Sequence, residues 1–146
     1  MPQTAPSPHS VMSCLDRIFQ AEMSGILRYL QFSFMIMGHS RIPIQKWFRE
    51  QAAESMLHAV EIGEKITALG GHPKFQPAPI DEPRTHALDD ILNKSLTHEL
   101  QALDLYKELA RLAEGDIALE EMARAFVRTE TEHIEQVRKM LRSQGD

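Results

Sequence analysis

The sequence predicts an all-α fold, a single bundle of four long helices. Four long segments repeat apolar residues with the 3.6-residue period of a helix, and no convincing segment alternates with the two-residue period of a strand. The length of 146 residues fits one domain, and 42% hydrophobic residues supply enough apolar material for a core. Two connections are short and the central one is roughly 15 residues, which favours two antiparallel helical hairpins joined by a long crossover.

The first helix is expected over residues 10–38. Its apolar seam begins at Val11 and recurs at three- and four-residue intervals to Ile36. Residues 1–9 contain three prolines and no apolar run. They are therefore expected to form a disordered N-terminal arm, ahead of a bundle domain over 10–146.

The second helix is expected over residues 43–69. Pro43 suits the first turn of a helix, because its missing N–H would have no partner there. Gly70 and Gly71 end the helix, since glycine tolerates the left-handed conformation of a helix end. The connection that follows, to about Thr85, holds four prolines and is expected to cross the bundle from one end to the other.

The third and fourth helices form the second hairpin. Thr85 is a plausible N-cap of the third helix, and Gly115 ends it. Asp116 can cap the fourth helix, whose apolar seam runs to Met140. The short connection between them predicts two antiparallel neighbours.

Charged side chains on the apolar seams are the informative feature for function. Glu22, Glu99 and Glu130 are each flanked by apolar residues, and no Lys or Arg shares these seams. A buried carboxylate without a partner costs several kcal/mol, so it must be paired, protonated or bound to a metal. A single Glu or His on such a seam is often at a solvated bundle edge, but a set on several helices favours a divalent cation. Glu130 and His133 are spaced i, i+3, so both can reach the same ion.

Two further side chains lie beside these positions. Tyr29 follows Glu22 by two helical turns, so it is either a redox-active or hydrogen-bonding neighbour of the site or an ordinary core tyrosine. His98 precedes Glu99 directly and therefore points about 100° away from it, which predicts that it is not a ligand.

These residues resemble the bacterioferritins, within the ferritin-like superfamily. The resemblance covers about residues 11–141 and is carried by Glu22 with Tyr29, Met56-Leu57-His58, His98-Glu99-Leu100 and Glu130-Thr131-Glu132-His133. It implies a ferritin-like four-helix bundle with a di-iron centre that oxidises Fe(II) with O2 or H2O2, in iron storage or detoxification. It also implies catalytic roles for Glu22, Tyr29, Glu99 and Glu130, and metal ligation by Glu22, His58, Glu99, Glu130 and His133. Glu130 would bridge the two irons.

The second helix departs from the family pattern. The family has a second bridging Glu three residues before the histidine, but here that position is Ser55 and the nearest carboxylate is Glu54. Glu54 becomes a metal ligand if the helix carries a one-residue π-bulge. Because the apolar seam stays in phase, we instead expect Glu54 on the flank beside Trp47 and Glu61. The centre would then be incomplete, with water or hydroxide in place of the second bridge.

Two other family features bear on cofactor and assembly. Haem-binding bacterioferritins place a ligating Met two residues before the second-helix histidine, and Met56 holds that position, so haem b is a candidate cofactor. The family's short fifth helix, which helps build the channel of a cage, is expected to be absent after His133. A 24-subunit cage is therefore doubtful.

The sequence also favours some partners over others. The formal net charge is −5 and the N-terminal arm has no Lys or Arg, which argues against nucleic acid. The most apolar stretch, residues 26–38, contains Arg28 and falls short of the ~20 residues of a spanning helix. With one cysteine, Cys14, and no signal peptide, a cytoplasmic location is expected.

A second apolar stripe on the first two helices predicts a homo-oligomer, at least a dimer. Its residues are Phe19, Met23, Leu27, Leu30, Phe34, Ala52, Met56, Ala59 and Gly63.

Two alternative functions stay open. One is a bundle with weak or lost ferroxidase activity in a structural or regulatory role. The other is a rubrerythrin-like peroxide reductase, although that family usually adds a four-cysteine module that one cysteine cannot supply.

Overall fold

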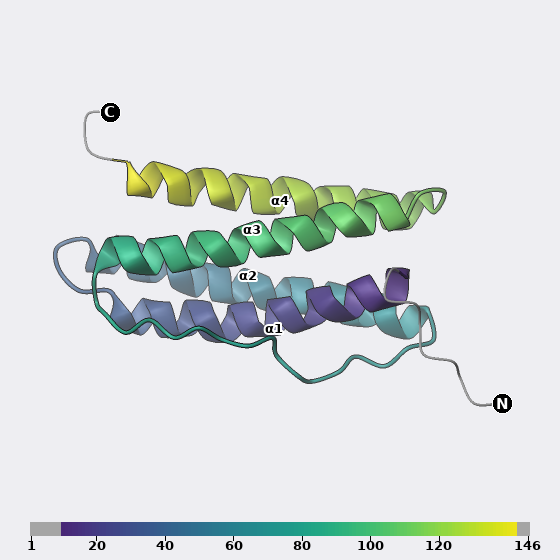
Figure 1. Ribbon diagram of the computed structural model, residues 1–146, viewed down its shortest axis with the longest axis horizontal. Coiled ribbons are helices and arrows are strands. Elements are labelled where there is room, and N and C mark those ends of the chain that lie inside the picture. Colours follow the sequence, from purple (N-terminus) through teal and green to yellow (C-terminus); the bar gives the residue numbers. More distant parts are fainter. Residues whose placement is uncertain (1–9, 143–146) are drawn as a thin grey trace.

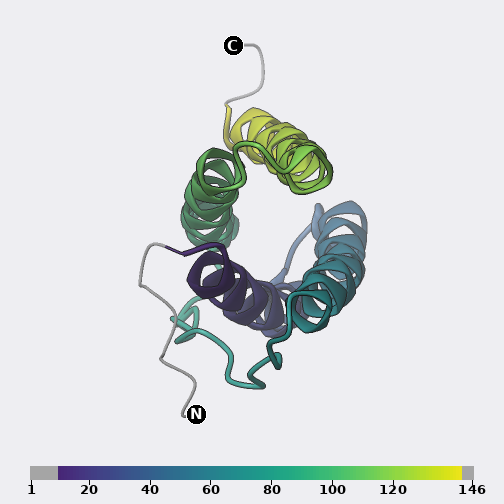
Figure 2. The ribbon, with the colours of Figure 1, turned by 90° about the vertical axis from the view of Figure 1, so that its right-hand side faces the viewer.

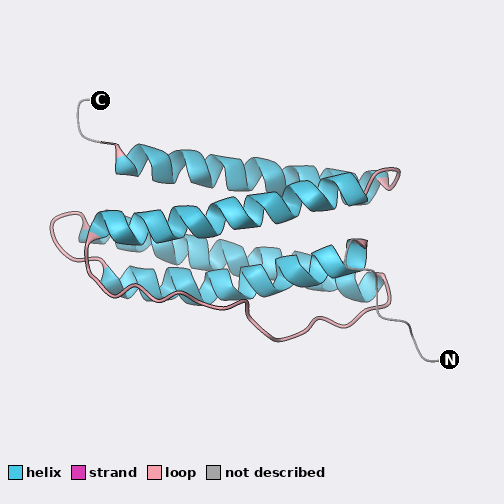
Figure 3. Cartoon of the chain, viewed as in Figure 1, coloured by secondary structure: helices cyan, strands magenta, loops and turns pink. Residues whose placement is uncertain are grey.

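The computed structural model describes residues 10–142 and confirms the all-α four-helix bundle. The helices are α1 (Val11–Met35), α2 (Arg41–Ala68), α3 (Leu88–Leu112) and α4 (Ile117–Leu141) (Figure 1). No strand occurs among the described residues (Figure 3). The expected disordered arm over residues 1–9 lies outside them. None of the helices in this part of the chain is long and apolar enough to cross a membrane.

The topology is two antiparallel hairpins joined by the expected crossover. Residues 69–87 run along the whole bundle, from the end of α2 to the distant start of α3 (Figure 1). α1 packs against α2 and α3, and α3 packs against α4. The backbones of α2 and α4 stay further apart, with no Cα pair within 8 Å among the described residues (Figure 2). Any contact between α2 and α4 must therefore be made by long side chains.

The helix ends follow local capping chemistry. The side chain of Ser10 accepts from the backbone N–H of Ser13 at 3.1 Å, and Asp116 accepts from Leu119 at 3.2 Å. Each side chain satisfies an N–H that has no partner within its helix. Gly115 has a φ of 94°, as the turn between α3 and α4 requires.

Two expected helix boundaries were wrong, by two residues at the start of α3 and by three at the end of α1. The N-cap of α3 is Ala87 rather than Thr85, because the Thr85 hydroxyl accepts from the N–H of Ala87 at 3.0 Å and holds a turn there. α1 ends at Met35 rather than at 38. The carbonyl of Ile36 accepts instead from the Arg41 guanidinium at 2.6 Å, so the chain leaves the helix early.

The core consists of two apolar clusters separated by a polar layer. One cluster holds Leu15, Ile18, Ile62 and Leu109, and the other holds Phe32 with its neighbours towards the opposite end of the bundle. Burying each such side chain contributes roughly 1.5–3 kcal/mol. The buried carboxylates of Glu22, Glu99 and Glu130 and the buried imidazoles of His58 and His98 lie along their helices between the two clusters. Burial of the two apolar clusters therefore offsets the free-energy cost of burying the charged and polar side chains between them.

The second apolar stripe is only partly at the surface. Leu27, Leu30, Phe34 and Met56 are exposed, the last at 59%, as expected for an interface. Phe19, Ala52 and Ala59 are instead buried within the chain, so their assignment to an exposed stripe was wrong. The crossover helps to cover that end of the face, where Phe75 packs edge-on against Phe19 with ring centroids 5.7 Å apart.

Candidate metal centre

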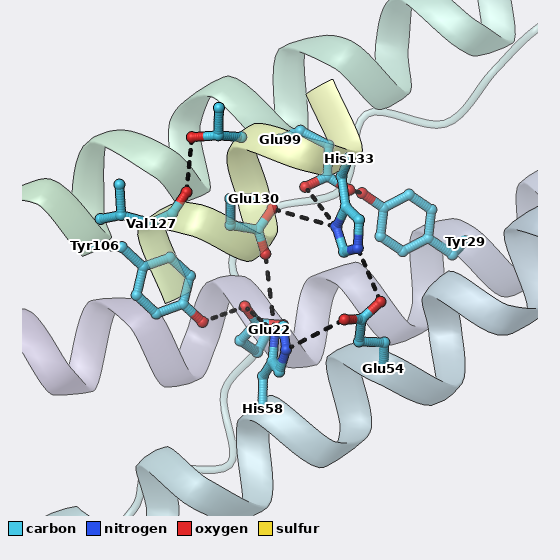
Figure 4. A network of polar contacts seen from close by, with 10 residues as sticks. Glu22, Tyr29, Glu54, His58, Glu99, Tyr106, Val127, Glu130 and His133 are labelled. Atoms are coloured by element: carbon cyan, nitrogen blue, oxygen red, sulfur yellow. Dashed lines mark hydrogen bonds and ion pairs between the residues drawn. The ribbon is translucent and has the colours of Figure 1, made fainter. Parts of the chain in front are cut away.

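Three carboxylates from three helices converge in the middle of the bundle. Glu22 on α1, Glu99 on α3 and Glu130 on α4 are each no more than 4% exposed. His58 on α2 and His133 on α4 lie among them (Figure 4). The five residues predicted as ligands are therefore brought together, each by the apolar seam that buries its helix face.

The five side chains form two ligand groups that share Glu130. One group is Glu22, His58 and Glu130, and the other is Glu99, Glu130 and His133. Within each group, the potential ligand atoms all lie within 4.8 Å of one another. Oε1 of Glu130 is 3.8 Å from Nδ1 of His58, and its Oε2 is 3.8 Å from Nδ1 of His133. One carboxylate thus presents one oxygen to each group, which is the arrangement of a bridge between two cations.

Several polar atoms that face the two groups are buried without hydrogen-bond partners. They are Nδ1 of His58, Nδ1 of His133 and Oε2 of Glu130. Leaving such an atom unpaired costs about 1–3 kcal/mol. Cations between these atoms would satisfy all three, so the donor set and its geometry fit a pair of divalent metal ions.

Two tyrosines hold the outer carboxylates by hydrogen bonds that cross the bundle. Tyr29 on α1 donates to Glu99 on α3, and Tyr106 on α3 donates to Glu22 on α1, the latter at 2.5 Å. Burial, with the nearby carboxylates, raises the pKa of both hydroxyls well above their usual value, so they remain donors. Each carboxylate is thereby oriented towards the centre.

Tyr106 was not singled out as a site residue from the sequence. The sequence spacing could have indicated it, because Tyr106 follows Glu99 by the same seven residues that separate Tyr29 from Glu22. The two hairpins also place His58 and His133 in matching positions after these glutamates. The site therefore has an approximate internal twofold symmetry.

Without metal, the electrostatics of the centre favour bound protons. Burial and the adjacent Glu99 carboxylate raise the pKa of Glu130 to about 10. Burial opposes protonation of His133, but its contacts with Glu130, Glu54 and Glu99 outweigh burial and raise its pKa to about 12. Burial also acts to raise the pKa of Glu99, yet its contacts with Glu130, His133 and Tyr29 lower it to about 2. Protons on Glu130 and His133 thus occupy places that cations would take.

Glu54 reaches the centre, and the expectation that it lies on the flank was wrong. Its Oε2 is 2.9 Å from Nε2 of His133, and its Oε1 is 3.7 Å from Nε2 of His58. The contact with His133 lowers the pKa of the Glu54 carboxyl. No π-bulge is needed, because α2 is a continuous α-helix through this region. The Glu54 side chain instead extends from α2 towards His133 on α4.

Ser55 and His98 line the same small cavity as the ligand residues. The cavity has a volume of about 10 Å³, which is room for roughly one water molecule. Gly25 lets both side chains approach α1, since a Cβ there would lie 2.9 Å from the Ser55 hydroxyl and 3.0 Å from Nε2 of His98. His98 packs edge-on against Tyr29, and burial lowers the pKa of its imidazole. It belongs to neither ligand group.

Comparisons with known proteins agree with this architecture. The family model of the ferritin-like domain matches residues 13–144. A ferritin-like di-iron-carboxylate protein from Bacillus anthracis superposes with a TM-score of 0.86 at 21% identity, over 90% of this chain and 95% of the other. No curated protein sequence matches the chain.

Two further structures are similar at the level of the fold. A dodecameric thioferritin from Bacteroides fragilis has a TM-score of 0.84 at 24% identity, over 90% of this chain and 83% of that one. The bacterioferritin of Rhodobacter capsulatus, solved with a metal-free dinuclear site and a haem iron, has a TM-score of 0.80 at 23% identity. The match covers 90% of this chain and 82% of the bacterioferritin. At these identities the likeness establishes the fold alone.

Proposed function

The chain belongs to the ferritin family, and we propose that it binds two Fe(II) ions at the candidate metal centre and oxidises them. The observation that carries this proposal is the shared position of Glu130, which offers one oxygen to each ligand group. Carboxylates and imidazoles are ligands that suit iron. The two irons are the substrate, and each would supply one electron to reduce O2 to peroxide or H2O2 to water.

The residues of this chain have separate tasks in that reaction. Glu22 with His58 and Glu99 with His133 would hold one ion each, and Glu130 would hold both. The buried tyrosine hydroxyls fix the outer carboxylates, so little reorganisation is needed when the ions enter. Ion binding must displace the protons on Glu130 and His133, because a ligand atom cannot hold a proton and a metal together. We therefore expect proton release on binding and tighter binding as pH rises.

An anaerobic titration tests this function. Metal-free protein should bind about two Fe(II) per chain, and later addition of O2 or H2O2 should consume the oxidant and produce the absorbance of Fe(III). Glu130→Ala should bind fewer ions than Glu132→Ala, because Glu132 is exposed and pairs with Arg128 at 3.1 Å instead. Equal iron content in the two variants would refute the ligand assignment.

The same titration separates the alternative functions. Stoichiometric Fe(II) binding without oxidant consumption would indicate a bundle that has lost catalysis. Repeated peroxide turnover with an added electron donor, without accumulation of Fe(III), would indicate a peroxide reductase. Accumulation of Fe(III) in the protein would support a role in iron storage or detoxification.

Haem b is a second candidate cofactor, at a place apart from the two-metal centre. Met56 lines an apolar groove of about 380 Å³ between α1 and α2, together with Met23 and Phe75. Its exposed thioether would be available to bind the haem iron, on a face that we propose to be shared with a second copy of the chain. Addition of haem should give a Soret band that Met56→Leu alters. Identical spectra for the two proteins would exclude this role.

A further inference from the structure

Glu54 lies at the solvent edge of the centre, and its place there differs from that of the other carboxylates. We propose that Glu54 is a positioning residue, not a metal ligand, and that it holds the imidazoles of both His58 and His133 through their Nε2 atoms. This inference rests on the proposed two-metal function. It assigns one side chain of α2 to the orientation of a ligand from each half of the site.

In both imidazoles, one ring nitrogen faces Glu54 and the other faces the interior of the centre. Nε2 of His133 and Nε2 of His58 face the two oxygens of Glu54, at 2.9 and 3.7 Å. Both Nδ1 atoms face the interior, where Nδ1 of His58 is 3.5 Å from Glu22 and Nδ1 of His133 is 3.8 Å from Glu99. Figure 4 shows the Glu54 carboxylate between the two rings, on the side away from Glu130. Glu54 is a member of neither ligand group.

This arrangement selects the nitrogen that a metal would use. A carboxylate that accepts from Nε2–H fixes the proton on that nitrogen and leaves the lone pair of Nδ1 available. It also fixes the rotation of the ring about its bond to the chain. Glu54 would act on His133 through a contact at hydrogen-bond distance and on His58 through a longer charge contact, so one carboxylate would orient both rings.

The contact between Glu54 and His133 also joins α2 to α4, two helices that do not pack directly. Glu54 and His58 are on α2, whereas His133 is on α4, and the backbones of these helices are too far apart to pack directly. Trp47 on α2 adds an edge contact to the His133 ring, with centroids 6.2 Å apart. The side chain of Glu54 is 33% exposed, compared with 5% for Glu130. The partly exposed side chain of Glu54 therefore connects α2 to α4 at the surface of the bundle.

Metal titration distinguishes a positioning residue from a ligand. We would titrate the full chain with Co(II), whose visible absorption reports ligand geometry, in the wild type and in Glu54→Ala and Glu54→Gln. Glu54→Ala should still bind two Co(II) per chain, since the ligand groups are intact, but about 10–100-fold more weakly and with an altered spectrum. Glu54→Gln should fall between the two, because its amide has one acceptor oxygen for two N–H donors.

The control is Glu50→Gln, one turn earlier on α2, where an exposed carboxylate pairs with Lys46 at 3.8 Å. It should leave affinity and spectrum unchanged. A drop in stoichiometry to one Co(II) in Glu54→Ala would show that Glu54 is a ligand and would overturn the proposal. Unchanged affinity in that variant would overturn it equally.

A second measurement separates this proposal from the proposed function. The Nε2–H resonance of His133, observed by nitrogen-edited NMR in metal-free protein, should be protected from exchange and should be lost in Glu54→Ala, and the ring resonances of His58, which is 3.7 Å from Glu54, should shift. If the wild type binds no Co(II), the proposed function fails and this NMR comparison alone decides the role of Glu54. A His133 Nε2–H resonance that persists in Glu54→Ala would refute the contact.

Discussion

Replacement of Glu130 by glutamine should stabilise the metal-free protein and should impair metal binding at the proposed two-metal site. In the folded chain, burial and the neighbouring Glu99 carboxylate raise the pKa of Glu130 from its ordinary value of 4.5 to about 10. At pH 7 the folded protein therefore keeps a proton on Glu130, whereas the unfolded chain releases it. Glutamine has nearly the same shape as the protonated acid and needs no proton.

The magnitude follows from linkage between protonation and folding. A carboxyl whose pKa is raised on folding gives its full stability below pH 4.5, and this contribution is lost as pH rises towards the folded pKa. Between pH 4.5 and 7, at about 1.4 kcal/mol per pH unit, the loss is about 3 kcal/mol. Glu130→Gln removes this penalty, so we expect a gain of up to about 3 kcal/mol at pH 7 that shrinks towards zero near pH 4.

Urea unfolding of metal-free protein, followed by circular dichroism at several pH values, measures this gain. Glu132→Gln is the matched control, since Glu132 is exposed on the same helix, and it should change stability by less than about 0.5 kcal/mol. The reasoning fails if Glu130→Gln is no more stable than wild type at pH 7, or if its gain is the same at pH 4. The variant should also bind fewer than two Fe(II), because an amide has one oxygen and cannot bridge.

Three further predictions test packing, the tyrosine contacts and assembly. Gly25→Ala should destabilise by about 1–3 kcal/mol in urea unfolding, because its Cβ would crowd two side chains at 2.9 and 3.0 Å. Gly63→Ala, whose nearest contact is an ordinary 3.4 Å, should instead be neutral or stabilise by up to about 1 kcal/mol. Tyr106→Phe removes the hydrogen bond to Glu22, so chelator competition should show weaker Fe(II) binding, by about 10–100-fold, with stability lower by roughly 1.5–3 kcal/mol. Leu30→Glu places a charge on the exposed apolar face, and light scattering should show a smaller species than wild type; an unchanged mass would place the interface elsewhere.

The local pattern of residues was sufficient to predict much of this protein. The 3.6-residue period determines which face of each helix is buried, so it also determined that Glu22, Glu99 and Glu130 point into the bundle. The lengths of the connections predicted the order and direction of the helices, including the crossover between the hairpins. The Asp116 cap was readable because it depends on bonds within one turn of the chain.

Only the tertiary structure decided how side chains from different helices meet. The direction of Glu54 depends on the distance between α2 and α4 and on its own side-chain torsions, neither of which is encoded by helical periodicity. The crossed hydrogen bond from Tyr106 to Glu22 likewise requires the relative height of α1 and α3. Phe19 is buried where a helix-only pattern exposes it, because the packed bundle and the crossover enclose it. Periodicity constrains the rotation of a residue about its own helix axis, whereas these contacts depend on the spacing and offset between helices.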